Sequence, residues 1–380
     1  MQAWNSQRFR AGAKASGSSE ETIQAAIEIA ACIRKENPRL PVVFTFHHLS
    51  HLTDVSSEFL QDVAFRKVDA YRTFQLKKRG KPNSVPAPAR RFRTISVPEP
   101  GLMRVQRWIS QNILNVTTTH AASFAFTPKR DLKQAAMRHR EAKWLVKMDI
   151  TSFFESIKEN KIYFVFRKLG YPPLLCFQMA RICTRLPIEH GSKIPKQDKM
   201  LPYKRRTEGF LPQGAPTSPM LANLVAHALD NDLSMLAAQE GWIYTRYADD
   251  LSFSHTECRS RQEAVALVRR VESLLKRHGF LHNPTKTTIS PPGARKIVLG
   301  LLVDREDPRL PKSFKNNLEA HLYALRSPKI GARAHVKRRG FTSHIGLRRH
   351  VYGLLAFAHH IEPSYAKKKY AEFNMIDWSA

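Results

Sequence analysis

Two adjacent aspartates, Asp249 and Asp250, constrain the fold of this chain more than any other feature of its sequence. Residues 242–247 are mostly β-branched or aromatic, and residues 251–254 alternate apolar and polar side chains, which predicts a β-hairpin. Successive side chains of a strand point to opposite faces, so two neighbouring aspartates share one target only at a turn. An ordinary aspartate-rich hairpin turn is the alternative interpretation.

A third carboxylate, Asp149, lies one hundred residues upstream of this pair, near the end of the mostly apolar run 144–150. Such a run predicts a buried strand, and residues 151–155 then predict the start of a helix. Burying a carboxylate is costly unless it is paired or bound to a metal. Taken alone, Asp149 is better interpreted as a helix N-cap; together with Asp249 and Asp250 it predicts a catalytic cluster.

The charge of the chain indicates its partner. It has 380 residues, 62 of them basic and 32 acidic, for a formal net charge of +30. Such an excess destabilises a compact fold unless a polyanion screens it, which favours nucleic acid. Apolar runs stay short of the eighteen or so residues of a membrane span, and we recognise no signal peptide. We therefore expect a cytoplasmic protein without a membrane partner.

The four cysteines are placed without a CxxC pair. Neither a zinc site nor a disulfide framework is therefore indicated, and free thiols in a reducing cytoplasm are the simplest expectation.

Residues 1–20 are polar, basic and rich in Ser and Gly, so we expect them to be poorly ordered. Apolar periodicity predicts a helix over 20–34. Strand-like runs at 71–76 and 92–97 flank a basic, proline-broken segment. Two strands joined by a basic loop can lie over a triphosphate; a solvated charged loop is the alternative.

The second half of the chain is predicted to be largely helical around the hairpin. A Gly/Pro-punctuated loop over 209–219 leads into a helix, and a clear amphipathic helix over 264–275 is closed by Gly279. From residue 312 onward the pattern predicts basic helices with interspersed aromatic residues, which suit RNA. A solvated helical bundle is the alternative for this region.

Three carboxylates that converge from two buried elements suit a pair of Mg²⁺ ions. Mg²⁺ prefers oxygen ligands and leaves coordination positions for phosphate oxygens. Two such ions stabilise both the attacking and the leaving oxygen of an in-line phosphoryl displacement. Lys286 would then protonate or neutralise a departing pyrophosphate.

Five motifs occur in a characteristic order: Asp149-x-x-x-x-Phe154, Leu211-Pro-Gln213-Gly214-Ala-Pro-x-Ser-Pro219, Tyr247-Ala-Asp249-Asp250, Asn283-Pro-Thr-Lys286-Thr and Val298-Leu-Gly300. With them the chain resembles reverse transcriptases, and closely resembles the bacterial retron group. The resemblance extends from His47 to Tyr370. It implies an α+β fold, the right-hand polymerase: an N-terminal extension over 1–44, fingers and an antiparallel palm sheet over 45–310, and a helical basic thumb over 311–380.

The resemblance also implies roles for matching residues. Asp149, Asp249 and Asp250 would hold two Mg²⁺ ions, with the backbone carbonyl of Ile150, and Lys286 would lie near the leaving pyrophosphate.

For the incoming deoxynucleoside triphosphate, Phe154 would exclude a ribose 2′-hydroxyl, and Gln213 would position the nucleotide and the template. Arg93, with Arg91 as a neighbour, would contact the triphosphate. The segment around Leu299 and Gly300 fits the primer-gripping hairpin.

Two motifs depart from the retron pattern. Retron enzymes typically carry Asn-Ala-x-x-His before the first catalytic aspartate, where this chain has Ala135 and ends the motif at His139. They also typically carry Val-Thr-Gly where this chain has Leu299 before Gly300. The resemblance implies that both segments recognise RNA. We therefore expect RNA contacts at His139, Leu299 and Gly300, and at the basic pair Arg348 and Arg349.

The function implied is that of an RNA-directed DNA polymerase. It would copy a cognate noncoding RNA from a 2′-hydroxyl of that RNA into a branched RNA–DNA product (msDNA), and act with an effector protein in antiphage defence. The alternatives are a diversity-generating or abortive-infection reverse transcriptase, a toxin-binding structural subunit, and a non-catalytic scaffold that binds RNA–DNA. Three clustered carboxylates facing phosphate argue against the scaffold.

Overall fold

The computed structural model describes residues 4–77, 92–187, 208–257, 259–327 and 329–378. Contacts within the chain divide it into two compact units. The first comprises Met1–Lys129, Ile150–Leu233 and Glu272–Asn283; the second comprises Arg130–Asp149, Ser234–Val271 and Pro284–Ala380. The expected division into an extension, fingers with palm, and thumb follows functional regions rather than these contacts, and it stays a prediction.

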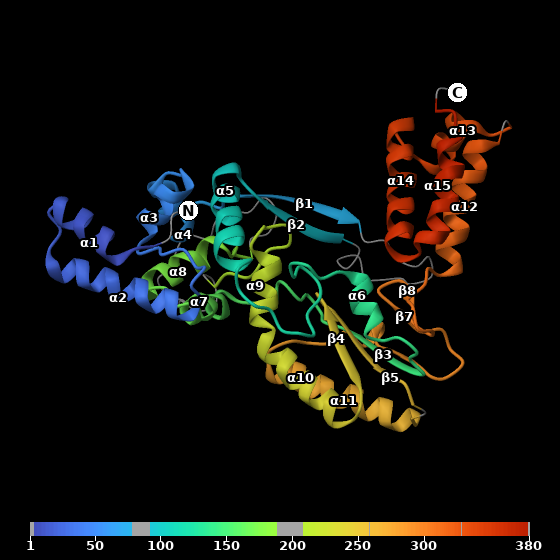
Figure 1. The fold of residues 1–380 in the computed structure, drawn as a ribbon, viewed down its shortest axis with the longest axis horizontal. Coiled ribbons are helices and arrows are strands. Elements are labelled where there is room, and N and C mark those ends of the chain that lie inside the picture. Colours follow the sequence, from blue (N-terminus) through green and yellow to red (C-terminus); the bar gives the residue numbers. More distant parts are fainter. Residues whose placement is uncertain (1–3, 78–91, 188–207, 258, 328, 379–380) are drawn as a thin grey trace. The chain divides into compact units, whose positions relative to one another are not determined.

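The first unit is mainly helical, with a two-stranded antiparallel sheet of β1 and β2 (Figure 1). Pro100 lies in the first turn of α5, where a missing N–H costs nothing. The predicted strands at 71–76 and 92–97 are confirmed. Its elements are α1 Ser6–Ala15, α2 Glu20–Glu36, α3 Phe46–Thr53, α4 Ser57–Ala64, β1 Tyr71–Lys77, β2 Phe92–Pro98, α5 Pro100–Ile109, the π-helix η2 Ser110–Leu114, α7 Glu159–Lys168, α8 Pro173–Ile182 and α9 Ser218–Val225.

The N-terminus corrects one expectation. Residues 6–15, expected to be poorly ordered, form α1, whose N-cap Asn5 accepts a hydrogen bond from the backbone of Arg8. The predicted helix over 20–34 is confirmed as α2, which has two glutamates in its first turn and two basic residues in its last. Charges placed in this way complement the helix dipole.

The second unit contains a four-stranded antiparallel sheet in the order β4-β5-β3-β6. The predicted strand and hairpin are therefore confirmed, and Figure 1 shows β3 and β5 side by side. The elements are α6 Leu132–Met137, β3 Trp144–Asp149, β4 Ile243–Tyr247, β5 Asp250–His255, the 3-10 helix η3 Pro284–Lys286, β6 Thr288–Ser290, β7 Ile297–Val298 and β8 Leu301–Leu302. Helices α10 His227–Gln239 and α11 Arg261–Arg277 contribute residues to both units.

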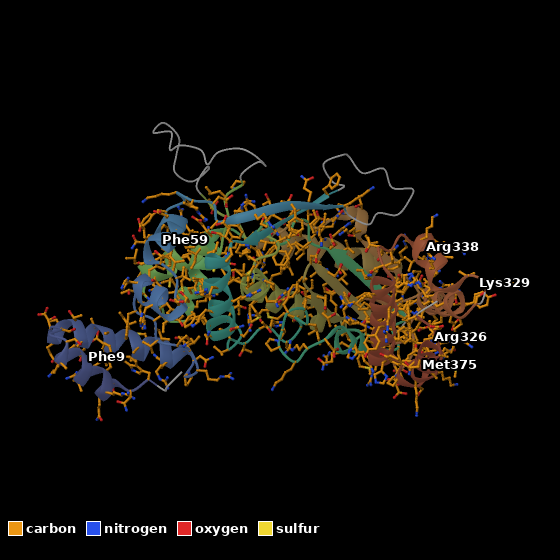
Figure 2. The ribbon with its side chains drawn as sticks, turned by 90° about the horizontal axis from the view of Figure 1, so that it is seen from above. Phe9, Phe59, Arg326, Lys329, Arg338 and Met375 are labelled. Carbon is orange, nitrogen blue, oxygen red and sulfur yellow. The ribbon has the colours of Figure 1, made fainter. Side chains whose placement is uncertain are left out.

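The C-terminal part of the second unit is a helical group, as its basic amphipathic pattern predicts. Its helices are α12 Lys312–Arg326, α13 Gly331–Arg339, α14 His344–Ile361 and α15 Pro363–Asn374. Their apolar faces meet in one core that also takes side chains from β8 and α6, such as Leu301 and Ala136. The basic residues Arg326, Lys329 and Arg338 lie on the outside of this group (Figure 2). Helices and antiparallel sheets together confirm the α+β class.

The described cysteines, Cys32, Cys176 and Cys183, are free, as expected. Burial raises the pKa of Cys176 and of Cys183 to about 12, so both thiols stay protonated. None of the helices within the described ranges combines the length and the apolar character needed to cross a bilayer.

Candidate active site

The hairpin turn is set by strand register. Asp149 ends β3 and pairs with Asp250, the first residue of β5. On the other side of β5, Tyr247 also pairs with Asp250, so Ala248 and Asp249 alone form the turn. Ala248 has a φ of 57°, a left-handed conformation that costs a non-glycine residue about 1–2 kcal/mol. Strain of this kind often persists at functional sites.

A lysine side chain lies against the carboxylate of Asp149. Strand β6 pairs Thr288 with Lys147 of β3, and the same antiparallel register carried two residues further brings Lys286 opposite Asp149. The Nζ atom of Lys286 indeed donates to Oδ1 of Asp149 at 2.6 Å. The Asp149 side chain is 7% exposed and that of Lys286 is 59% exposed. An ammonium group on a largely exposed side chain therefore faces a buried carboxylate.

Several neighbouring charges act on the pKa of Asp250, some raising it and some lowering it. Burial raises its pKa, and the negative charge of Asp249 raises it further, whereas the positive charge of Lys147 lowers it. Lys147 lies two residues before Asp149 on β3, so strand alternation places both on one face. Lys147 was not among the predicted site residues, although this spacing of two was visible in the sequence.

The three carboxylates are not gathered into a preformed metal centre. No set of three or more His, Cys, Asp or Glu side chains within the described ranges is arranged to hold an ion. The register nevertheless brings Asp149 and Asp250 opposite one another, with Asp249 adjacent. Carboxylates this close repel unless cations separate them, and the Lys286 ammonium supplies one such charge.

The residue expected to contact RNA before the first aspartate is placed differently. His139 is fully buried, with 0% of its surface exposed. Its ring nitrogens lie 2.7 Å from Oγ of Ser254 and 2.6 Å from Oγ1 of Thr245, two hydroxyls of the hairpin formed by β4 and β5. A side chain enclosed in this way does not reach solvent, so the expected direct contact with RNA at His139 conflicts with its burial.

Both faces of the hairpin strand β5 are buried, which its alternating sequence did not indicate. Tyr244 and Phe253 stack on one face with ring centroids 4.9 Å apart. Thr245 and Ser254 lie on the other face and are 3% and 0% exposed. Alternation of polar and apolar residues usually means one solvated face. Here α6 packs against β4 and removes that solvent.

The first unit holds two more of the expected site residues, Ile150 and Phe154. Ile150 is 1% exposed, and its backbone bridges to His282. Phe154 is half-buried, and its ring centroid lies 5.6 Å from that of Phe153 and 6.3 Å from that of Phe126. Packed aromatic neighbours hold the Phe154 ring in place.

The loop that carries Gln213 is fixed to strand β2. The carbonyl of Gln213 accepts a hydrogen bond of 2.7 Å from the backbone N–H of Ser96. Gly214 has a φ of +110°, and a Cβ there would lie 2.9 Å from both the Ser96 carbonyl oxygen and Cγ2 of Ile95. Only glycine permits this close approach.

Strand β2 also carries Arg93, which is exposed. The same element thus presents Arg93 and supports Gln213. Arg91 lies outside the described residues.

The remaining expected RNA contacts lie in the second unit. Leu299 and Gly300, with φ of 49° and 84°, form the two-residue turn between β7 and β8. A turn of this kind needs positive φ at both central positions. Leu299 is half-buried and Gly300 is exposed. Arg348 and Arg349 are both exposed on α14, where the Arg348 guanidinium lies 5.8 Å from the centre of the Trp378 ring.

Comparison with known proteins gives matches over most of the chain. Residues 76–302 match the family described as reverse transcriptase (RNA-dependent DNA polymerase). The chain is 31% identical over 312 residues to the retron Ec86 reverse transcriptase of Escherichia coli, covering 82% of this chain and 87% of that protein. It is 29% identical over 300 residues to the retron Mx162 reverse transcriptase of Myxococcus xanthus, covering 76% of this chain and 59% of that protein, less than two thirds of its length.

Among solved structures, a telomerase from Candida albicans in complex with a fragment of telomeric RNA is similar with a TM-score of 0.41 and 10% identity. The similarity covers 80% of this chain and 56% of the telomerase chain.

Proposed function

Because the chain belongs to the reverse transcriptases of the retron type, we propose that this RNA-directed DNA polymerase copies a cognate structured noncoding RNA into a branched RNA–DNA product. Synthesis would begin from a 2′-hydroxyl of that RNA. The enzyme would act with an effector protein in defence against phage. Family membership establishes the polymerase activity, and the identity of the product is our proposal.

One observation supports the catalytic assignment above all others: Asp149 and Asp250 pair across neighbouring strands, although one hundred residues separate them. The adjacent Asp249 lies in the turn. An ordinary aspartate-rich turn would not require a third carboxylate opposite it. We therefore assign catalysis to Asp149, Asp249 and Asp250.

Members of this family use divalent metal ions, and the donor set fits them. Oxygen ligands from a few carboxylates are what Mg²⁺ prefers. The three aspartates, with the backbone carbonyl of Ile150, would hold two ions. When bound, such ions stabilise the attacking and the leaving oxygens during phosphoryl transfer.

The neighbouring lysines place positive charge beside these carboxylates. Lys286 donates to Asp149, and Lys147 lowers the pKa of Asp250 against the effect of burial. More than half of the Lys286 side chain is exposed, so a pyrophosphate in solvent could reach it. We assign it the neutralisation of that leaving group.

Nucleotide selection is assigned to residues of the first unit. Arg93 would contact the triphosphate, Gln213 would position the nucleotide, and Phe154 would exclude a 2′-hydroxyl. The hydrogen bond between the Ser96 N–H and the Gln213 carbonyl supports this assignment, since it fixes the loop to the strand that carries Arg93.

RNA binding is assigned to the exposed basic surface of the C-terminal helices, with Arg348 and Arg349, and to the turn of Leu299 and Gly300. A basic surface with aromatic residues binds phosphates and stacks unpaired bases.

The decisive experiment is to isolate the protein from its host and to sequence the nucleic acid that co-purifies. We expect a short single-stranded DNA joined to RNA. Asp249→Asn should abolish DNA synthesis while RNA binding stays nearly unchanged, because the basic surface lies on other elements. A host that carries this variant should also lose protection against phage.

RNA recovered without any DNA that depends on Asp249 would instead indicate a binding scaffold. DNA that carries no branch to RNA would point to another class of reverse transcriptase. Equal loss of RNA binding and synthesis in Asp249→Asn would mean that the aspartate cluster is structural.

A further inference from the structure

A single buried imidazole joins both strands of the catalytic hairpin. His139 follows α6, and its two ring nitrogens reach Thr245 on β4 and Ser254 on β5. Thr245 precedes the turn by three residues and Ser254 follows Asp250 by four, so both hydroxyls lie close along the chain to the catalytic aspartates. One rigid ring bonded to both strands fixes how far one can slide past the other.

The ring is uncharged. Burial lowers the pKa of His139 to about 3, and the nearby charge of Arg138 lowers it further. A neutral imidazole offers one donor and one acceptor, and each hydroxyl can take either role. The two hydrogen bonds therefore satisfy every polar atom of the ring in a place where an unsatisfied one would be expensive.

Helix α6, which precedes His139, is itself held in place at several points. α6 begins with a capping box, in which Asp131 and Gln134 each accept from the other's backbone N–H. Ala136 is buried in the core of the C-terminal helical group. Nζ of Lys133 donates to the carbonyl of His360, 3.1 Å away on α14. His139 thus ties the hairpin to an element that is itself anchored.

The face of the hairpin that points away from His139 is stabilised by other residues. Arg246 is 0% exposed, and its Nη1 lies 3.2 Å from the carbonyl oxygen of Ala248, to which it donates. That bond supports the strained residue of the turn. The stacked rings of Tyr244 and Phe253 fill the same face.

We propose that His139 is a positioning residue for polymerisation, whose ring holds β4 and β5 in the alignment that keeps Asp249 and Asp250 in place against Asp149. This inference rests on the assignment of those aspartates as catalytic. It replaces the expected RNA contact at this position. The histidine of the motif acts inward on the hairpin, whereas its neighbours Arg138 and Arg140 are exposed to solvent.

The test uses the full-length protein and an RNA oligonucleotide template with an annealed DNA primer. Single-nucleotide incorporation is measured after active-site titration, so that unfolded molecules do not count. His139→Ala should lower kcat about 10- to 100-fold, since displacement of a catalytic group by about 1 Å can have such an effect. The KM for the nucleotide and the Kd for RNA should change less than about twofold.

A second variant separates positioning from folding. His139→Leu combined with Thr245→Val and Ser254→Ala replaces the polar group by apolar side chains, which is often nearly neutral for stability. We expect this triple variant to recover the Tm of the native protein but not its kcat, because apolar contacts lack the direction of hydrogen bonds. Arg138→Ala, at an exposed position, is the matched control and should leave kcat unchanged.

A native kcat in the triple variant would overturn the proposal, and so would weaker RNA binding with unchanged kcat in His139→Ala. Asp249→Asn is measured in parallel. If that variant keeps its activity, the assignment of the catalytic aspartates is wrong, whatever His139 does.

Discussion

Charged residues of both signs meet at the end of β3. Burial and Asp249 raise the pKa of Asp250, and Lys147 and Lys286 oppose them. Lys286 also pairs directly with Asp149. Two carboxylates can therefore face each other across the strands because two ammonium groups lie close by.

Acid should destabilise the protein through His139. The pKa of its ring is near 3 in the folded state and near the ordinary 6.5 in the unfolded state. Below pH 6.5 the unfolded chain therefore binds a proton at this histidine, whereas the folded chain does not. This contribution to stability is complete above pH 6.5 and decreases as the pH falls toward 3. We expect the free energy of unfolding to drop by about 1.4 kcal/mol per pH unit in that window from this one group.

Urea unfolding at pH 7.5, 6 and 5 measures this slope. His139→Gln should make the slope of unfolding free energy against pH shallower by about 1.4 kcal/mol per pH unit, which corresponds to one proton. His321, whose pKa burial lowers to about 4, adds a slope of the same sign that the variant retains. His47→Gln, at an exposed position of α3, serves as the control. An identical slope in native protein and His139→Gln would show that this ring titrates normally.

At the scale of elements, the loop around Gln213 depends on a glycine. Gly214→Ala would place a Cβ within 2.9 Å of Ile95 and of the Ser96 carbonyl, at a φ of +110°. We expect a loss of about 1–3 kcal/mol of stability, and a higher KM for the incoming nucleotide because Gln213 must move. Steady-state kinetics with varied nucleotide concentration measure the second effect.

Gly12→Ala, in the open surroundings of α1, is the control for Gly214→Ala. If Gly214→Ala leaves the nucleotide KM unchanged, then Gln213 does not position the nucleotide.

Two glycines of the C-terminal region should respond to alanine in opposite directions. A Cβ added at either position would meet no atom within 4 Å, but Gly300 has a φ of +84° whereas Gly353 lies inside α14. Gly300→Ala should lower stability by about 1 kcal/mol, the cost of a left-handed alanine. Gly353→Ala should raise it by about 0.5–1 kcal/mol, since alanine favours helix. Urea midpoints compare the two, and equal signs would contradict the turn geometry.

At the scale of the whole molecule, a net charge of +30 dominates the interaction with nucleic acid. Binding to a single-stranded RNA releases counterions, so the logarithm of the affinity should fall linearly with the logarithm of salt concentration. Arg348→Ala combined with Arg349→Ala should make that slope shallower by about 1.4, or about 0.7 for each lost phosphate contact. Fluorescence anisotropy over a series of salt concentrations measures it.

Lys35→Ala combined with Arg39→Ala removes the same charge from exposed positions at and just beyond the end of α2. This control should shift affinity far less. Equal slopes for both double variants would mean that net charge, and not the surface of α14, determines binding.

Local sequence patterns were enough to predict most elements and the reaction. The hairpin around Asp249 and Asp250, the strand that ends at Asp149 and the C-terminal helices all follow from periodicity and turn residues. Such patterns work because backbone conformation and the alternation of side chains are set by near neighbours. The order of the motifs then indicated the family.

Long-range packing decided what the patterns left open. Whether the polar face of β5 meets water or α6 depends on a segment more than one hundred residues earlier, so alternation alone did not reveal that His139 is buried against Thr245 and Ser254. The contact of Lys286 with Asp149 likewise follows from the register of β6 on β3. Sequence thus determined the family and the groups proposed to carry the chemistry, and tertiary structure decided their partners, because burial and charge act through space rather than along the chain.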